Sequence, residues 1–246
     1  MRKLLFLALT ACLFALPDLA AAQSLSFDLG MQESGSTTAR MIQIILLITI
    51  ISVAPSILVM VTSFTRIVVV LSLLRVAMGT QQTPPNQVMI GLALFLTAFI
   101  MTPVFEKSYE DGILPLINEE INEEAALKAA AEPFHTFMLA HTRDKDLDLF
   151  VNMTQDTFEI ATPEDTPYQV LVPAFMISEL RRAFEIGFLV FVPFLIIDML
   201  VASVLMAMGM MMLPPVLISL PFKIIFFVLI DGWYMITGSL VRSFGV

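Results

Sequence analysis

The stretch Met41–Phe64 reads MIQIILLITIISVAPSILVMVTSF and contains 24 residues without a single charged side chain. An α-helix rises 1.5 Å per residue, so this segment is long enough to cross the ~30 Å hydrocarbon core of a bilayer. The whole chain is similar in character: 246 residues, 58% hydrophobic, 14% charged, with a mean hydropathy of +0.88. That composition is too apolar for a soluble domain of this length and predicts a membrane protein built from helices.

Further apolar segments follow along the chain. Val88–Phe105 has the length of a second span, and Ile186–Phe222 and Val216–Val241 supply two more. Between the first two spans, Arg66 and Arg75 bracket a short apolar segment, and a turn is expected at residues 79–85, which contain Gly79, Pro84 and Pro85. The sequence therefore predicts an all-α fold of hydrophobic helical hairpins.

An acidic insert interrupts these apolar segments. From Glu106 to Tyr168 there are fifteen acidic and four basic residues, whereas the rest of the chain is nearly neutral. Such a balance argues against nucleic acid as a partner, because phosphate binding needs a basic surface. Residues 118–132 are rich in helix formers, and Pro133 is suited to the first position of another helix. The insert is thus expected to be mainly helical, and its apolar stripes either form an assembly surface or pack on the chain itself.

The first 22 residues have the pattern of a cleavable signal peptide. A basic start precedes the apolar run Leu4–Leu16, and small residues follow at the minus-three and minus-one positions. Cleavage is predicted between Ala22 and Gln23, with Ala20 at minus three. Two alternatives stay open: acylation of Cys12, as in a lipoprotein, or an uncleaved anchor helix. The expected organisation is signal peptide 1–22, flexible tail 23–40, hydrophobic helices 41–105, acidic domain 106–172 and hydrophobic helices 173–246.

Three charged residues lie inside apolar segments: Asp198, Lys223 and Asp231. A charge in the hydrocarbon is costly unless it is paired or faces a wet interior. Lys223 and Asp231 are eight residues apart, about 12 Å along a helix, so they cannot pair on a straight helix. Their partners are expected on other helices or other chains, unless the side chains extend to the ends of the spans. Basic residues also flank the outer ends of the spans, against the positive-inside rule, which favours a larger assembly over an independent bundle.

No catalytic or metal site is predicted, and no cofactor. His135 and His141 are six residues apart, whereas a helical metal pair needs a spacing of four. Asp144, Asp146 and Asp148 have the alternate spacing of a calcium loop, but the glycine and the bidentate glutamate of that motif are missing. Phosphate-binding loops and nucleophile motifs are also absent, so the sequence does not indicate an enzyme.

Three long motifs resemble the FliP family, the flagellar branch of the type III export-gate proteins. They are GTQQTPPNQVMIGLALFLTAFIMTPV at residues 79–104, PAFMISELRRAFEIGF at residues 173–188, and the segment from GMMMLPP through LPFKIIFFVLIDGW at residues 209–233. The resemblance extends from about Met41 to Phe244. The pair Arg181–Arg182 makes the second motif more basic than the family pattern.

The resemblance implies a role in protein transport. It implies a protein of the bacterial inner membrane, at the flagellar basal body, with its insert on the periplasmic side. Several copies would form a ring with the smaller export-gate proteins FliQ and FliR and with other export components. Unfolded flagellar proteins would cross the membrane through that ring. Two alternatives remain: a transporter or ion channel that uses Asp198, Lys223 and Asp231, or a scaffold that conducts nothing.

The segment MAMGMMMLPP, residues 206–215, is the predicted gate. Methionine is unbranched, flexible and apolar, so a ring of methionines could seal a pore and still deform around a passing chain. We expect Met210, Met211 and Met212 to form this compliant seal, and Met206 and Met208 to pack within the helix. A hinge is expected from three residues, Gly209, Pro214 and Pro215. Without the resemblance, the cluster would be interpreted as core packing.

Subunit contacts are expected at three residues. Phe137 and Phe150 are large apolar rings in an acidic domain, so we expect them to pack between copies. Glu179 stands beside two arginines and is a candidate ion pair between subunits, with a local pair inside the chain as the alternative.

Overall fold

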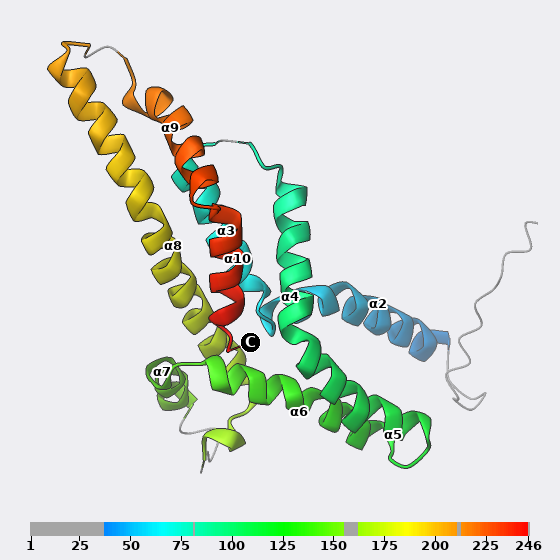
Figure 1. Ribbon diagram of the computed structural model, residues 1–246. Helices are drawn as coiled ribbons and strands as arrows, with labels where there is room; N and C mark the ends of the chain where they lie inside the picture. Colours follow the sequence, from blue (N-terminus) through cyan, green and yellow to red (C-terminus); the bar gives the residue numbers. More distant parts are fainter. Residues whose placement is uncertain (1–36, 81, 155–161, 211–212, 246) are drawn as a thin grey trace, which may run out of the picture. The chain divides into compact units, whose positions relative to one another are not determined.

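The computed structural model describes residues 37–80, 82–154, 162–210 and 213–245, and these residues form helices joined by turns (Figure 1). In chain order the elements are α2 (Thr37–Met60), α3 (Phe64–Met78), α4 (Asn86–Ser108), the π-helix η1 (Tyr109–Ile113), α5 (Leu114–Ile117), α6 (Glu123–His141), α7 (Asp144–Thr154), the 3₁₀-helix η2 (Pro163–Asp165), α8 (Tyr168–Ala207), α9 (Pro215–Leu229) and α10 (Gly232–Arg242). No strand occurs in the described residues, and the predicted all-α fold class is confirmed.

The chain divides into two compact units, residues up to Thr49 and residues from Ile50 onward. Helix α2 crosses this division. Its most apolar stretch lies within Arg40–Met60, and none of it is buried inside the protein. A helix that is hydrophobic all round needs lipid or another protein to cover it.

In the second unit, α3 lies between α8 and α4 (Figure 1). Its fully buried apolar side chains are Ile67, Val70, Leu71, Leu74 and Ala77, a spacing that places them on one helical stripe. Gly187 allows α8 to approach this helix closely, because a Cβ atom at that position would lie 2.2 Å from the side chain of Leu73. A helix of only 15 residues thus forms the centre of the core.

The end of α4 joins the acidic insert to this core. The hydroxyl of Ser108 donates to the carbonyl of Ala130 on α6 over 2.7 Å. One turn later, in the π-helix, Gly112 lies so close to α6 that a Cβ atom would come within 2.6 Å of the Ala130 backbone. Several apolar side chains of α6, including Phe137 and Met138, are buried in the same core as α3 and α8. Part of the insert therefore packs on the chain itself.

The expected helix start at Pro133 is wrong, because this proline lies inside α6. The helix begins ten residues earlier, where the side chain of Asn122 accepts a hydrogen bond of 2.8 Å from the N–H of Ala125. A proline inside a helix removes a hydrogen bond and displaces nearby carbonyl groups. Here two carbonyls just before it accept bonds from other helices: Ala130 from Ser108, and Ala131 from the hydroxyl of Tyr168 over 3.0 Å.

By length and composition, three helical stretches of the described residues can cross a membrane: Arg40–Met60, Asn86–Ile117 and Tyr168–Ala207. The pair α9 and α10 would make a fourth span if it crosses as one unit, bent by 63°. Helix α8 has 40 residues, which is about 60 Å and roughly twice the hydrocarbon thickness. This helix is therefore longer than a single crossing of a bilayer requires.

Candidate gate loop and the buried charges behind it

The side chain of Arg66 forms a buried ion pair with Glu179. Its Nε donates to the glutamate Oε2 over 2.8 Å, and its Nη2 donates to Oε1. Both side chains are almost completely buried, at 1% and 0% exposure. The remaining Nη1 donates to the carbonyl and the hydroxyl of Ser243, at 3.0 and 2.9 Å. The guanidinium carbon lies 3.6 Å from the ring centroid of Phe244.

This arrangement connects α3, α8 and the end of α10 at one point. A buried ion pair is tolerated only when its remaining donors and acceptors are also satisfied, and the contacts to Ser243 fulfil that condition. The expected pairing of Glu179 across subunits is therefore not observed. Its carboxylate is buried within its own chain, and its partner is Arg66 rather than the neighbouring Arg181 or Arg182.

An aromatic cluster surrounds this pair. The ring of Phe137 lies 6.0 Å from Phe175 and 6.1 Å from Phe244, and it is only 9% exposed. Phe137 was expected between subunits, but helices of its own chain bury it. His141 also contacts both Phe137 and Phe244, with ring centroids 4.5 and 5.2 Å away. Burial lowers the pKa of His141, against the opposing effect of its hydrogen bond to the carbonyl of Phe137. Phe150 is half-buried, and its role between subunits stays a prediction.

A second ion pair, between buried Lys223 and half-buried Asp198, joins α8 to α9. Lys223 Nζ donates to Asp198 Oδ2 over 2.6 Å, and Ser219 donates to the other carboxylate oxygen over 2.5 Å. Lys223 also donates to the carbonyl of Ala77, 3.1 Å away in the last turn of α3. A cation at this position is favourable because the C-terminal end of a helix carries partial negative charge. Lys223 thus has both partners on other helices, and it is 3% exposed.

Asp231 is not part of this network. It lies at the break between α9 and α10, where its backbone is left-handed with φ of 50°. Its side chain is exposed in the single chain, so no contact within the described residues buries it, and its burial in an assembly stays a prediction. The next residue, Gly232, lies so close to the ring of Phe227 that a Cβ atom would approach it to 2.2 Å. The bend therefore depends on this glycine.

The candidate gate loop begins where α8 ends. The N–H of Gly209 donates to the carbonyl of Met206, and the N–H of Met210 donates to Leu205, both over 3.0 Å. This pair of bonds is the Schellman motif, which requires a left-handed residue, and Gly209 has φ of 74°. On the other side, Pro214 is extended and Pro215 is the first residue of α9. The three expected hinge residues thus lie where the backbone leaves one helix and enters the next.

The described methionines of this segment, Met206, Met208 and Met210, are exposed in the chain. Met206 and Met208 are 60% and 58% exposed, so the expected packing of these two within the helix is not observed. Met210 is 37% exposed. Met211 and Met212 lie outside the described residues, as do the predicted cleavage residues Ala20, Ala22 and Gln23 and the alternative acylation site Cys12.

The histidines and aspartates considered as metal ligands have other partners. His135 is buried and makes a 2.8 Å hydrogen bond with the carbonyl of Thr166. Asp146 accepts bonds of 2.8 Å from Arg143 and of 2.6 Å from Ser178. Partial burial raises the pKa of Asp146, but these bonds and the charge of Arg143 outweigh it, so its pKa lies below the ordinary 3.8. The described residues contain no group of three potential metal ligands.

The sequence alone identified the charged residues near the apolar segments, but it did not identify the residues with which they pair. Arg66 was identified only as a residue flanking an apolar segment, although a charge beside such a segment signals the need for a partner. Its partner Glu179 lies 113 residues away, and Ser243 lies 177 residues away. Several carboxylates were available at such distances, so spacing alone could not select one.

These features define a class: a helical membrane protein whose long apolar helices carry internally paired charges and are joined by a methionine-rich loop. A model of the FliP family matches residues 47–240. The chain is 54% identical to the flagellar biosynthetic protein FliP of Agrobacterium fabrum, over 97% of this chain and 98% of the relative. It is 55% identical to FliP of Caulobacter vibrioides, over 97% and 88%, and 56% identical to FliP of Bacillus subtilis, over 82% and 91%. The chain belongs to the FliP family, and its role is in flagellar biosynthesis.

Proposed function

We propose that the chain is a pore-forming subunit of the flagellar type III export gate, in the bacterial inner membrane at the flagellar basal body. Copies of the chain would form a ring, together with FliQ, FliR and other export components, through which unfolded flagellar proteins leave the cytoplasm. Membership of the FliP family supports the flagellar role. The membrane-length helices support the membrane location. The acidic insert would then face the periplasm.

The gate loop carries this proposal. The Schellman motif at Gly209 and the two prolines hold a short connection between the ends of α8 and α9. Along this connection and the last turn of α8, the described methionines are exposed rather than packed in the core. Flexible apolar side chains presented at a helix end can seal against one another when copies meet, and they can separate when a polypeptide passes.

Exposed apolar side chains on the long helices support an assembly of several copies. They are found on α8 and α9 and include Phe184, Phe188, Leu200, Leu217 and Leu229. A soluble monomer rarely exposes so much contiguous apolar surface, so lipid or other subunits must cover these faces. In a ring, the same loop from each copy would be repeated around the axis and form a hydrophobic constriction, which resists wetting by water and ions.

The test replaces Met210, Met211 and Met212 together with alanine and measures ion conductance of membranes that contain the complete export gate. Shorter side chains would leave gaps in the seal, so we expect a resting ion leak while export of flagellar proteins continues. The matched control is Met199→Ala, an exposed methionine on α8 two turns before the loop. It should not leak. An unchanged resting conductance in the triple variant would contradict the proposal.

The two alternatives give different results in the same measurement. A transporter would need its ionisable groups free to exchange ions, but Asp198 is held by Lys223 and Ser219. For that class, Asp198→Asn should abolish ion coupling and the methionine variant should have no effect. A scaffold that conducts nothing should show no conductance in any variant.

A further inference from the structure

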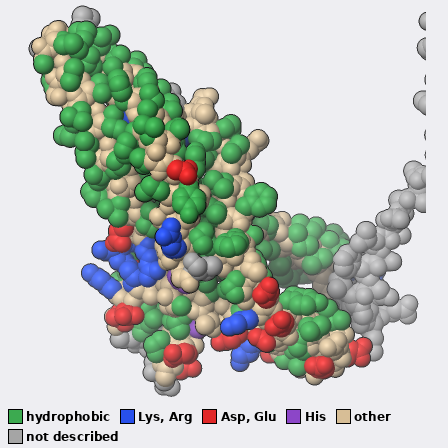
Figure 2. Space-filling model, viewed as in Figure 1, with side chains coloured by type: hydrophobic (Ala, Val, Ile, Leu, Met, Phe, Trp, Pro, Cys, Tyr) green, Lys and Arg blue, Asp and Glu red, His purple; other side chains and the backbone are tan. Residues whose placement is uncertain are grey.

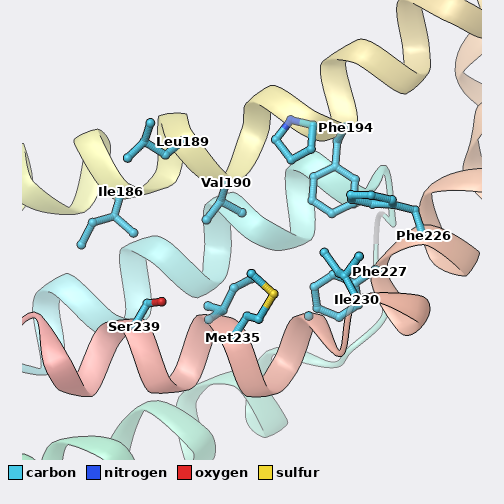
Figure 3. A pocket seen from close by; sticks show the side chains of 12 residues that line it. Ile186, Leu189, Val190, Phe194, Phe226, Phe227, Ile230, Met235 and Ser239 are labelled. Atoms are coloured by element: carbon cyan, nitrogen blue, oxygen red, sulfur yellow. The ribbon is translucent and has the colours of Figure 1, made fainter.

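An apolar pocket of about 340 Å³ lies between α8, α9 and α10 (Figure 3). On α8 it is lined by Ile186, Val190 and Phe194, which face Ser239 and Met235 of α10, and Phe227 of α9 lies at the far end. The hydroxyl of Ser239 is the only polar side-chain group among the lining residues. The volume of the pocket is within the ~300–1,000 Å³ range of small-molecule sites.

The two long walls of the pocket run in opposite directions. Ile186 on α8 is at the same end as Ser239 on α10. Phe194 is at the other end, where its ring lies 6.2 Å from that of Phe227, which is close to Gly232. The lining spans residues 186–194 on α8 and 232–239 on α10, which are nine and eight residues and about 12 Å along each axis. Both walls belong to segments with the length and composition of membrane spans. The pocket is therefore an elongated apolar slot whose walls can lie within a membrane.

Two arginines lie one turn beyond the same end of this slot. Arg182 precedes Ile186 by four residues on α8, and Arg242 follows Ser239 by three residues on α10. The Arg242 side chain folds back along its helix, where its Nε donates to the carbonyl of Gly238 over 3.2 Å. Figure 2 shows basic side chains gathered beside the apolar surface in this part of the molecule.

Neither guanidinium pairs with a carboxylate within the described part of the chain. Of the two glutamates nearest to Arg182 on α8, Glu179 pairs with Arg66 and Glu185 pairs with Arg181. At the opposite end of the slot, exposed Asp231 precedes Gly232 and forms no ion pair within the described residues. The slot thus has two cations without a carboxylate partner at one end and an anion at the other.

We propose that this slot binds an anionic phospholipid. One acyl chain would lie between α8 and α10, and the phosphate would accept hydrogen bonds from Arg182 and Arg242. Guanidinium groups are well suited to phosphate because they donate bidentate, charge-assisted bonds. Basic residues next to an apolar crevice between membrane helices form a typical site for an anionic headgroup. This inference depends on the membrane location of these helices and not on conduction by the gate loop.

The test uses the full-length protein, purified in mild detergent with its oligomer intact. Native mass spectrometry would measure binding of phosphatidylglycerol and of phosphatidylcholine with identical acyl chains. We expect about tenfold tighter binding of phosphatidylglycerol, because charged hydrogen bonds are the stronger ones. The double variant Arg182→Gln, Arg242→Gln should remove this preference. Arg181→Gln is the matched control: it removes one charge from the same turn of α8, and its side chain is already paired with Glu185. It should retain the preference.

A second variant tests the slot separately from the headgroup. Val190→Phe places a larger side chain in the open pocket and should reduce binding of both lipids while the oligomer stays intact. Glycerol 3-phosphate, which has no acyl chain, should not compete with the lipid. Equal binding of the two lipids, the same loss in Arg181→Gln, or full competition by glycerol 3-phosphate would each overturn the proposal. Binding of neither lipid would also overturn it and would indicate that protein fills the slot.

Discussion

The two ends of helix α8 differ in how their side chains are held. Near its N-terminal end, Glu179 is fully buried and bonded to Arg66, and aromatic rings from the insert and from the end of α10 surround the pair. At its C-terminal end, Met206 and Met208 are more than half exposed. Asp198, two turns before the loop, is the last residue there with an ion pair in the described structure.

We call the end of α8 around Glu179 the fixed end, and the end at Met206 and Met208 the adaptable end. Buried, fully satisfied polar networks have one favourable geometry, and losing one partner is costly. Exposed methionines have many rotamers of similar energy. The proposed role as a gate subunit would require both, since such a subunit would keep its position in an assembly and deform at one point. Substitutions at the fixed end should therefore affect stability, and substitutions in the loop should mainly affect conduction.

The largest expected effect is at the buried ion pair. Arg66→Ala should lower the free energy of unfolding by about 3–5 kcal/mol, because it leaves the carboxylate of Glu179 buried without a partner. Thermal unfolding of the purified protein in detergent measures this loss. Replacing both partners, as Arg66→Met with Glu179→Leu, should cost less than Arg66→Ala alone.

The control for this comparison is the exposed pair Arg181–Glu185 on the same helix, whose side chains are 55% and 60% exposed. Arg181→Ala should cost no more than about 0.5 kcal/mol, because water already solvates both charges. Equal losses for Arg66→Ala and Arg181→Ala would show that the fixed end does not depend on its buried pair.

The next largest loss of stability is expected at the contact between α6 and the π-helix η1 that follows α4. Gly112→Ala should destabilise the protein by about 1–3 kcal/mol, because the added Cβ would lie 2.6 Å from the backbone of Ala130, which cannot move aside as a side chain could. Gly91→Ala is the matched control on α4, where a Cβ atom would meet no other atom within 4 Å. It should stabilise the helix by roughly 0.5–1 kcal/mol. Unfolding curves of the two variants should shift in opposite directions, and shifts in the same direction would contradict the close contact.

Much of the helical content could be predicted from local sequence. The charge-free run of α2 and the apolar run of α4 are local signals, and both were located to within a few residues. The 40-residue length of α8 was not predicted, because the apolar segment was expected to begin at Ile186, whereas the helix begins at Tyr168 and contains Pro173 and Pro193. A single proline can remain inside a helix in an apolar environment, since neighbouring groups satisfy the freed carbonyl. The consecutive prolines 214 and 215, preceded by a left-handed glycine, do mark the junction of two helices.

The candidate site was only partly predictable for a physical reason. The cost of a charge in an apolar segment depends on that segment alone, so Asp198 and Lys223 could be singled out from the sequence. The partner of a charge depends on packing between segments that are far apart in the chain. Phe137 shows the same limit: its need for burial was recognised, but Phe175 and Phe244 of its own chain meet that need, rather than a neighbouring copy.

A smaller effect is expected at the start of the gate loop. Gly209→Ala should cost about 1–2 kcal/mol, because alanine is disfavoured at the φ of 74° that the Schellman motif requires. Hydrogen exchange in the last turn of α8 should accelerate. Gly209→Asn, which tolerates the left-handed conformation, should restore most of the protection. If both variants lose the same protection, the left-handed residue does not determine where α8 ends.

The smallest effect is the response of the fixed end to acid. The pKa of Asp146 is lowered in the folded protein, so its stabilisation is complete above about pH 4 and is lost as the pH falls through the lower, folded value. The pKa of His141 is also lowered, by burial, so below about pH 6.5 the unfolded chain binds a proton before the folded one does. Both groups therefore destabilise the insert as the pH falls, each by less than the buried pair contributes.

Hydrogen exchange in α6 and α7 at pH 7, 5 and 3 measures this response. Asp146→Asn should remove the step below pH 4, and it should cost no more than about 1 kcal/mol at neutral pH because its partner Arg143 is partly solvated. Asp148→Asn, on the exposed side of α7, should leave the step unchanged. The last turn of α8 carries no acid-labile pair in the described structure, so its exchange should show no matching step. A parallel acid response there would mean that the two ends of α8 open together and are not independent.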